Sequence, residues 1–289
     1  MDTTASAPPL EAAPAVAPRR IYRHRLAVRL MHWINVLCLT ILLGSGLNIF
    51  NAHPALYWGH DSSGKPWLSM RAENSPSGPV GRTRIGSTDF DTTGVLGMSK
   101  VDGQPTARGF PSWATIPGGQ WLAMARHWHL FFAWLFVVNG IAYVLYTIFS
   151  RHLAKDLVPT RFELRNIGRS IVDHLKFKHP TGDAALRYNV LQSLTYLIVI
   201  FGLLPLVVIA GMGMSPRLNA VFTGWVDLLG GRQSARSLHF LAALGLVIFV
   251  VVHVVEVFIA GVWNEMRSMI TGWYRVPEDR KDAKEKLPS

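Results

Sequence analysis

The sequence predicts an all-α integral membrane protein, built as a bundle of four membrane-spanning helices. Hydrophobic residues make up 49% of its 289 residues and charged residues only 16%, whereas soluble domains carry about 25% charged residues. The mean hydropathy is +0.23 although the formal net charge is +11. Four segments of bilayer length carry no charge apart from Glu256. Nucleic-acid binding would explain the positive charge but not these long apolar runs, so no nucleic-acid partner is expected.

The four apolar segments should cross the lipid bilayer as helices, because in lipid only an internal hydrogen-bond ladder satisfies the backbone. They are residues 30–50, 128–149, 190–211 and 237–262. Pro205 is expected to kink the third helix. The membrane domain would cover 21–276, between an Ala- and Pro-rich N-terminal segment, 1–20, expected to be disordered, and a charged tail, 277–289. The first span is expected to act as an uncleaved anchor.

Lysine and arginine indicate the orientation of the helices. Residues 1–29 hold five, the 151–189 loop holds eight and the segment after the fourth span holds six, against six in the long 51–124 loop and three in 212–236. The positive-inside rule therefore predicts cytoplasmic termini and a long periplasmic loop between the first two helices. That loop is rich in Gly, Pro, Ser and aromatic residues, which favours a folded cap over a floppy connector. The single cysteine, Cys38, excludes an internal disulfide, a cysteine-ligated zinc ion and an iron–sulfur cluster.

Histidines inside the predicted spans are the strongest functional signal. Ionisable groups at membrane depth are costly and indicate function by default, and four are present: His32, His129, His239 and His253. His239 and His253 are fourteen residues apart, which is about 40° short of four full turns and about 21 Å along the helix axis. They should therefore face the same way, one near each side of the apolar core. Loop histidines such as His53 and His60 are expected to be solvated.

The predicted topology gives each of these two histidines a partner. His32 begins the first helix near the cytoplasmic face, level with His253, and His129 lies near the periplasmic face, level with His239. Two cross-helix pairs at two depths match iron held by two histidines between the helices of a bundle. Haem fits best, because its apolar macrocycle suits the bundle core and two axial imidazoles leave no position open for oxygen chemistry. Since no CxxCH motif occurs, the sequence predicts two non-covalent b-type haems.

Two details refine this prediction. An arginine precedes three of the histidines by three residues, one turn nearer the membrane surface, at Arg29, Arg126 and Arg236. These guanidinium groups could bind haem propionates, or they could snorkel as arginines beside any span do. His127 lies about 200° from His129 around the helix, so only one of them faces the core. The deeper His129 is favoured.

Several stretches resemble bacterial cytochromes b. The run Arg29-Leu-Met-His-Trp-Ile-Asn35 resembles the opening of the cytochrome b561, Ni-hydrogenase and formate-dehydrogenase cytochrome b group, and the fourteen-residue histidine spacing is similar to that of the formate-dehydrogenase subunit. Further stretches resemble the thiosulfate-reductase cytochrome b subunit-like group: His53-Pro-Ala-Leu-Tyr-Trp-Gly59, Phe90-Asp-Thr-Thr-Gly94, Arg126-His-Trp-His-Leu-Phe-Phe-Ala-Trp134, Gly230-Gly-Arg-Gln-Ser-Ala-Arg-Ser-Leu-His239 and Trp263-Asn-Glu-Met-Arg-Ser-Met-Ile-Thr-Gly272. The resemblance covers about residues 20–276.

The resemblance implies a di-haem electron carrier of the bacterial inner membrane, linking the quinone pool to a periplasmic oxidoreductase subunit, of which a molybdopterin enzyme is one candidate. It also places the second-helix ligand at His129. Glu256 departs from the family pattern. It follows His253 by three residues, so it could relay protons to a quinone near the inner haem, or it could be an interfacial carboxylate that reaches water or a loop arginine. Asn35, one turn beyond His32, could serve the same region or bridge two helices.

Two other functions remain open from the sequence. A self-contained quinone-linked oxidase of a small periplasmic reductant, such as superoxide, would need no protein partner. The long 51–118 loop and the 151–189 loop favour a subunit that docks a partner instead. A histidine-rich metal transporter would need a polar pathway, but the spans are otherwise apolar and aromatic.

Overall fold

The computed structural model describes residues 19–76, 78–150, 158–160, 164–165, 167–175 and 190–276. Three predicted segments lie wholly or mostly outside the described residues: the N-terminal segment 1–20 expected to be disordered, of which 1–18 are not described, the charged tail 277–289, and the 151–189 loop. Strand β1 (Arg20–Tyr22) already begins at Arg20, inside the segment that was expected to be disordered, and it pairs antiparallel with β8 (Trp273–Arg275). The ordered domain therefore starts slightly earlier than predicted.

Four helices are long and apolar enough to cross a membrane, and they match the four predicted spans. They are α1 (Leu26–Asn51), α2 (Leu122–Phe149), a third helix over Val190–Gly213 and α8 (Arg232–Thr271). The third consists of α5 (Val190–Ile198), the π-helical turn η4 (Val199–Leu203) and α6 (Leu204–Gly213). The irregularity expected at Pro205 takes the form of this wider turn, which ends just before the proline, a residue without an amide hydrogen.

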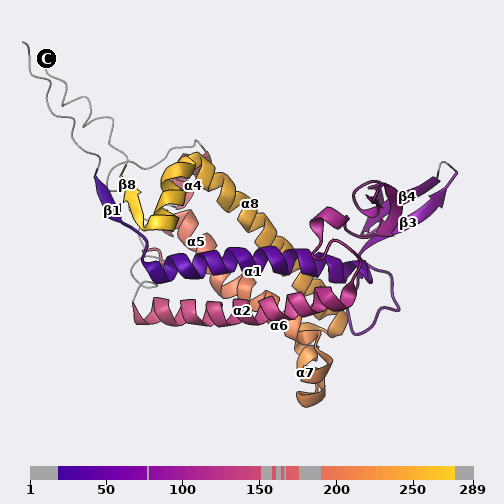
Figure 1. Ribbon diagram of the computed structural model, residues 1–289. Coiled ribbons are helices and arrows are strands. Elements are labelled where there is room, and N and C mark those ends of the chain that lie inside the picture. Colours follow the sequence, from indigo (N-terminus) through magenta and orange to yellow (C-terminus); the bar gives the residue numbers. More distant parts are fainter. Residues whose placement is uncertain are drawn as a thin grey trace, which may run out of the picture.

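Helix α8 runs nine residues beyond the predicted fourth span, and it changes direction at Gly261. Gly261 has φ 105° and ψ 83°, values that a residue with a side chain rarely adopts. The part after this bend packs against the start of α1, where Trp33 Nε1 donates a hydrogen bond to the Met269 carbonyl over 3.1 Å and Arg29 donates to the Ile270 carbonyl. Together with the β1–β8 pair, these bonds hold the end of α8 against the start of α1, an arrangement that we call the clamp (Figure 1).

The expectation of an all-α fold is wrong in the long loop after α1, because that loop folds into strands. An antiparallel sheet in the order β2-β3-β4-β5 and a β6–β7 hairpin form a cap. The bounds are β2 (Ala55–Leu56), β3 (Leu68–Ser75), β4 (Gly78–Ile85), β5 (Thr88–Asp91), β6 (Gly97–Val101) and β7 (Gln104–Arg108). Asp102 and Gly103, with φ of 50° and 80°, supply the tight turn of the hairpin. The predicted folded cap is therefore confirmed, and it is a β structure.

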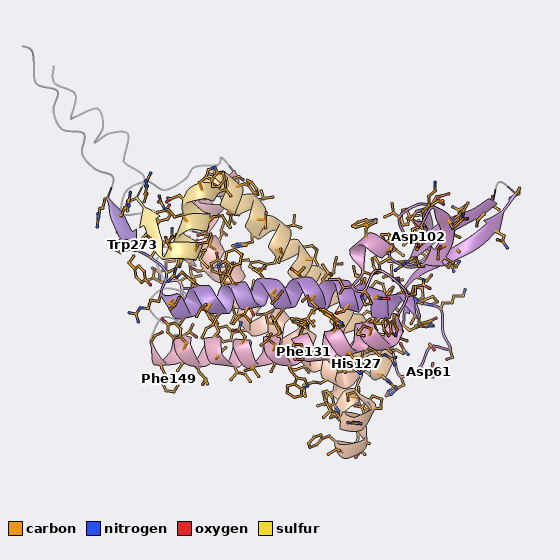
Figure 2. All side chains as sticks on the ribbon, viewed as in Figure 1. Asp61, Asp102, His127, Phe131, Phe149 and Trp273 are labelled. Carbon is orange, nitrogen blue, oxygen red and sulfur yellow. The ribbon has the colours of Figure 1, made fainter. Side chains whose placement is uncertain are left out.

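The main apolar core lies where α1 meets this cap. Phe50 at the end of α1 packs with Leu56, Leu68 and Met70 of the sheet. The chain then returns through η1 (Ser112–Ala114) to α2. Cap and helices occupy opposite parts of the molecule: Asp61 and Asp102 lie at the cap end, and Phe149 and Trp273 at the other (Figure 2).

The transmembrane helices pack as two pairs, α1 with α2 and α6 with α8. Helix α8 runs obliquely past α1, and α5 and α6 lie behind α1 in this view (Figure 1). Three short elements complete the described chain: α4 (Ile167–Leu175), α7 (Pro216–Val221) and η5 (Trp225–Leu229). Because the two pairs touch each other little, space remains between them, and the candidate site lies there.

Candidate functional site

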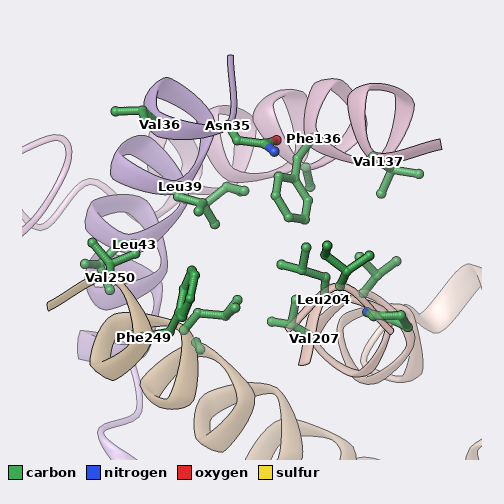
Figure 3. Close-up of a pocket in the computed structure, with 18 of the residues that line it drawn as sticks. Asn35, Val36, Leu39, Leu43, Phe136, Val137, Leu204, Val207, Phe249 and Val250 are labelled. Carbon is green, nitrogen blue, oxygen red and sulfur yellow. The ribbon is translucent and has the colours of Figure 1, made fainter. Parts of the chain in front are cut away.

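A single large cavity of about 3230 Å³ separates the two helix pairs. Ordinary small-molecule pockets measure about 300–1,000 Å³, so this cavity has room for more than one prosthetic group. Its middle is apolar: Phe136 from α2 and Phe249 from α8 point into it, opposite Leu204 and Val207 of α6 (Figure 3). Such a lining suits a flat apolar macrocycle far better than a solvated ion.

All four histidines predicted inside the membrane line this cavity, and the structure brings them together in two pairs. The ring centres of His129 and His239 are 6.1 Å apart, with 65° between the ring planes. Those of His32 and His253 are 6.3 Å apart, with 63° between the planes. Each pair joins one helix of the α1/α2 pair to α8, so α8 contributes a histidine at both depths.

These separations are those of two imidazoles on one metal ion. Two rings that bind a first-row metal from opposite sides at about 2.0–2.1 Å, each with its centre about 1.1 Å behind the bonding nitrogen, have centres about 6.3 Å apart. Direct edge-to-face contacts of aromatic rings fall in the same range, about 4.5–7 Å, so the separation is compatible with a shared metal ion, and the apolar cavity around both pairs is the second observation that points to one. Both pairs therefore fit iron held between axial imidazoles, and the apolar space around them fits the macrocycle.

The hydrogen bonds of the cap-side pair indicate which ring nitrogen is free to bind. Nδ1 of His239 is 2.7 Å from the Val207 carbonyl, which can only accept, so this nitrogen carries the hydrogen. Nδ1 of His129 is 3.1 Å from Ser45 Oγ, whose own hydrogen points at the Ile41 carbonyl over 2.6 Å. The serine oxygen therefore accepts from His129. In both rings Nε2 keeps its lone pair, as a metal ligand requires.

The other pair is held by packing. The ring of His253 stacks on Phe249, with centres 5.9 Å apart and 20° between the planes. His32 contacts the edge of Trp33, with centres 5.4 Å apart. No hydrogen bond joins either imidazole to another residue within the described part of the chain. The two pairs are thus alike in separation and different in what fixes their rings.

The predicted arginines behave differently from one another. Arg126 and Arg236 line the cap end of the cavity, one turn beyond His129 and His239. Arg236 donates a hydrogen bond to the His53 carbonyl and lies 5.6 Å from the centre of the Phe50 ring. Arg29 does not line the cavity, since its guanidinium group bonds to Ile270 of the clamp. At that end Arg23, His24 and Arg25 line the cavity instead.

Three other residues discussed from sequence have clear positions. His127 is exposed on the face of α2 that carries Phe131, outside the cavity lining, so it is His129 that faces the cavity (Figure 2). Glu256 lines the cavity, one turn beyond His253. Asn35 accepts a hydrogen bond of 2.8 Å from Asn139 Nδ2 and so bridges α1 and α2.

Sequence reasoning missed several contributors to the site. His53 and His60 are exposed, as expected, but they also line the cavity mouth at the cap end, which the sequence did not indicate. His53 stacks on Tyr57 with ring centres 5.9 Å apart, and burial together with nearby Arg236 lowers the pKa of His53. Ser45 and Val207 carry no sequence signal for a role beside a histidine, because only the helix packing brings them there.

Four apolar helices and two opposed histidine pairs in one cavity are the features expected of a membrane haem protein. Comparison with known families agrees. The profile of the prokaryotic cytochrome b561 family matches residues 23–272, so the chain belongs to that family. It is therefore a multi-pass membrane cytochrome of the b type that carries electrons through haem.

A curated relative gives a second comparison. A protein from Azospira oryzae, named as a protein-methionine-sulfoxide reductase subunit (YedZ1), is 37% identical over 154 residues. The match covers 53% of this chain and 74% of the relative.

Proposed function

We propose that this chain carries electrons between the quinone pool of the bacterial inner membrane and a periplasmic oxidoreductase subunit, through two haem b groups. The observation that supports this best is the presence of two histidine pairs in one apolar cavity, with ring centres 6.1 Å apart within one pair and 6.3 Å apart within the other. Iron held by two imidazoles exchanges single electrons and leaves no position open for a substrate. Chemistry on a final substrate therefore belongs to a partner.

In this proposal His129 and His239 hold the outer haem, near the cap, and His32 and His253 hold the inner haem. Arg126 and Arg236, which line the cavity beside the outer pair, would bind the propionates of the outer haem through charge-assisted hydrogen bonds. The same role for Arg29 at the inner haem has no support from the cavity lining.

The periplasmic side of the proposal rests on the cap and on the relative. The cap stands beyond the outer pair and gives a docking subunit a folded surface. One face of its sheet carries ion pairs across β3, β4 and β5, among them Arg84–Asp89 at 2.6 Å. The name of the Azospira relative supports a sulfoxide reductase as the partner's class, and a molybdopterin enzyme would fit that role.

On the inner side we propose that Glu256 passes protons during quinone turnover. Its carboxylate lines the cavity one turn beyond His253. Quinone reduction or quinol oxidation moves protons together with electrons, so a proton-accepting group beside the inner haem is required. Val250, Val254 and Val257 of the same helix also line the cavity, which suits a hydrophobic ring, while Arg23, His24 and Arg25 line its outer edge.

The haem assignment is tested by replacing each histidine by alanine in the full-length protein. His129→Ala or His239→Ala should remove the outer haem only, and His32→Ala or His253→Ala the inner haem only. His127→Ala is the matched control, because His127 is exposed on the face of α2 turned away from the cavity, and it should keep both. Pyridine haemochrome and reduced-minus-oxidised spectra report about two b haems in the wild type and one in each ligand variant. Wild-type protein that contains no haem, or whose haem is covalently attached, would contradict the proposal.

The Glu256 role needs a separate test. Glu256→Gln keeps the shape and hydrogen bonding of the side chain but takes up no proton at neutral pH. Reduction of the inner haem by quinol, followed by stopped flow across a pH series, should slow and lose a pH-dependent step while both haem spectra stay normal. Equal rates at every pH would remove Glu256 from the mechanism without touching the haem assignment.

A further inference from the structure

Each histidine of the outer pair rests against the neighbouring helix of its own helix pair. His129 of α2 lies against α1, where Ser45 accepts its Nδ1 hydrogen bond. His239 of α8 lies against α6, where the Val207 carbonyl accepts the equivalent bond. The two contacts are the same in kind although the acceptor is a side chain in one and a backbone carbonyl in the other.

A glycine stands beside each acceptor, at the point where the ring touches the helix. A Cβ added to Gly46 would come 3.3 Å from Cε1 and 3.6 Å from Nδ1 of His129. One added to Gly211 would come 3.2 Å from both Cε1 and Nδ1 of His239. Contacts under 3.4 Å are tighter than nearly all real Cβ contacts, so the ring would have to move by a few tenths of an ångström.

Neither glycine has a backbone reason to be glycine. Both lie inside helices and neither has a positive φ. In a helix interior glycine costs about 0.8–1.0 kcal/mol relative to alanine, so something else must favour it. The imidazole against each Cα is the contact that the structure offers.

The inner pair has no such arrangement. Among the described residues, neither the His32 nor the His253 ring has a hydrogen bond, and no glycine Cβ position comes within 4 Å of either ring. Aromatic packing against Trp33 and Phe249 is what fixes these rings.

We propose that Ser45, Gly46 and Gly211 are positioning residues for the outer haem ligands, an inference that rests on the haem function proposed above. Ser45 accepts the Nδ1 hydrogen bond of His129, and the two glycines set how far each ring can rotate about its bond to the iron. A hydrogen bond at Nδ1 makes an imidazole a stronger donor, which stabilises ferric iron and lowers the reduction potential. Among the described residues, the outer haem would receive this contribution on both ligands and the inner haem on neither.

The test uses the full-length, haem-loaded protein and reads out the haems rather than turnover. Ser45→Ala should raise the midpoint potential of the outer haem in a spectroelectrochemical titration. The Leu42 backbone also accepts from His129, so a shift is expected rather than loss of the haem. Gly46→Ala and Gly211→Ala should change the low-spin ferric EPR signal of the outer haem, because that signal depends on the angle between the axial ring planes. The histidine variants described above assign each signal to its haem.

Two control variants match the chemistry away from the site. Thr147→Val removes a buried hydroxyl that donates to the Val144 carbonyl over 2.9 Å, as Ser45 donates to Ile41. Gly202→Ala adds a methyl group where no atom lies within 4 Å, in the same membrane span as Gly211. Both should leave the two potentials and both EPR signals unchanged.

The outcomes separate the two proposals. Loss of the outer haem alone in a glycine variant also supports the positioning role, because the retained inner haem reports a folded protein. Two normal haems in all three variants, or equal changes at both haems, would overturn the positioning role and leave the haem function standing. A wild-type protein without haem would overturn both.

Discussion

The amide bridge between Asn35 and Asn139 should stabilise the bundle by a measurable amount. Asn139 is only 6% exposed, and its Nδ2 donates to Asn35 Oδ1 over 2.8 Å and to the Met31 carbonyl over 2.9 Å. Hydrogen bonds between helices in membranes average about 0.6 kcal/mol and reach about 1.7 kcal/mol. Asn139→Leu should therefore lower the free energy of unfolding by about 1–3 kcal/mol.

A double-mutant cycle with Asn35→Leu isolates the bond between the two side chains. We expect a coupling energy of about 0.6–1.7 kcal/mol, measured by unfolding in mixed micelles with rising dodecyl sulfate and followed by helical circular dichroism. Met31 and Asn35 flank His32, so the inner haem should be released earlier than the outer one. Val138→Leu, at a side chain that is 61% exposed, is the control. A coupling energy of zero would show that the bridge contributes nothing and that Asn35 is free for another role.

Three further predictions concern the cap and the clamp. Arg108 is only 4% exposed, and Arg108→Met removes the hydrogen bonds of its guanidinium group. Because each such charged bond is worth about 1.5–3 kcal/mol, the cap should become protease-sensitive while both haem spectra persist. Gly272→Val would overlap the Tyr22 ring at a residue with φ 88°, and the opened clamp should weaken binding of the inner haem in a haem-transfer assay. The hydrogen bond from Arg84 lowers the pKa of Asp89 below its usual 3.8. The carboxylate of Asp89 therefore binds a proton more readily in the unfolded cap than in the folded one. Its contribution to the stability of the cap is complete above about pH 4 and is lost as the pH falls through the lowered pKa. Asp89→Asn should remove that step from an acid-unfolding curve.

The spans and the histidine pairs could be predicted because both follow from one-dimensional patterns. Charge-free runs of bilayer length give the helices, and the fourteen-residue spacing of His239 and His253 gives their common face. The positive-inside rule then set His32 beside His253 and His129 beside His239. Each step uses only the rise and turn of a helix, which tertiary contacts change little.

The cap and the ligand supports could not be predicted in the same way. The Asp102-Gly103 turn was a readable hairpin signal, but strands such as β5, whose residues are all exposed, lack a clear alternation. Gly46 and Gly211 look like ordinary membrane-helix glycines until the packing of α1 on α2 and of α6 on α8 puts a ring against each. The bend at Gly261 likewise shows no motif beyond a glycine near the end of a span.

The haem groups should also hold the two helix pairs together. Within the described chain α8 makes few contacts with α1 and fewer with α2, yet both histidine pairs span that gap. A ligand that binds only the folded state stabilises it by RT ln(1 + [L]/Kd), about 2.7 kcal/mol at a hundred times Kd. Protein produced under haem limitation should therefore unfold at lower temperature than haem-replete protein, with each single-haem histidine variant in between. Because direct contacts join α1 to α2 and α6 to α8, the helical circular dichroism of the haem-poor form should stay nearly unchanged before it unfolds. Equal unfolding temperatures for haem-poor and haem-replete protein would mean that contacts other than the histidine bridges join the two halves.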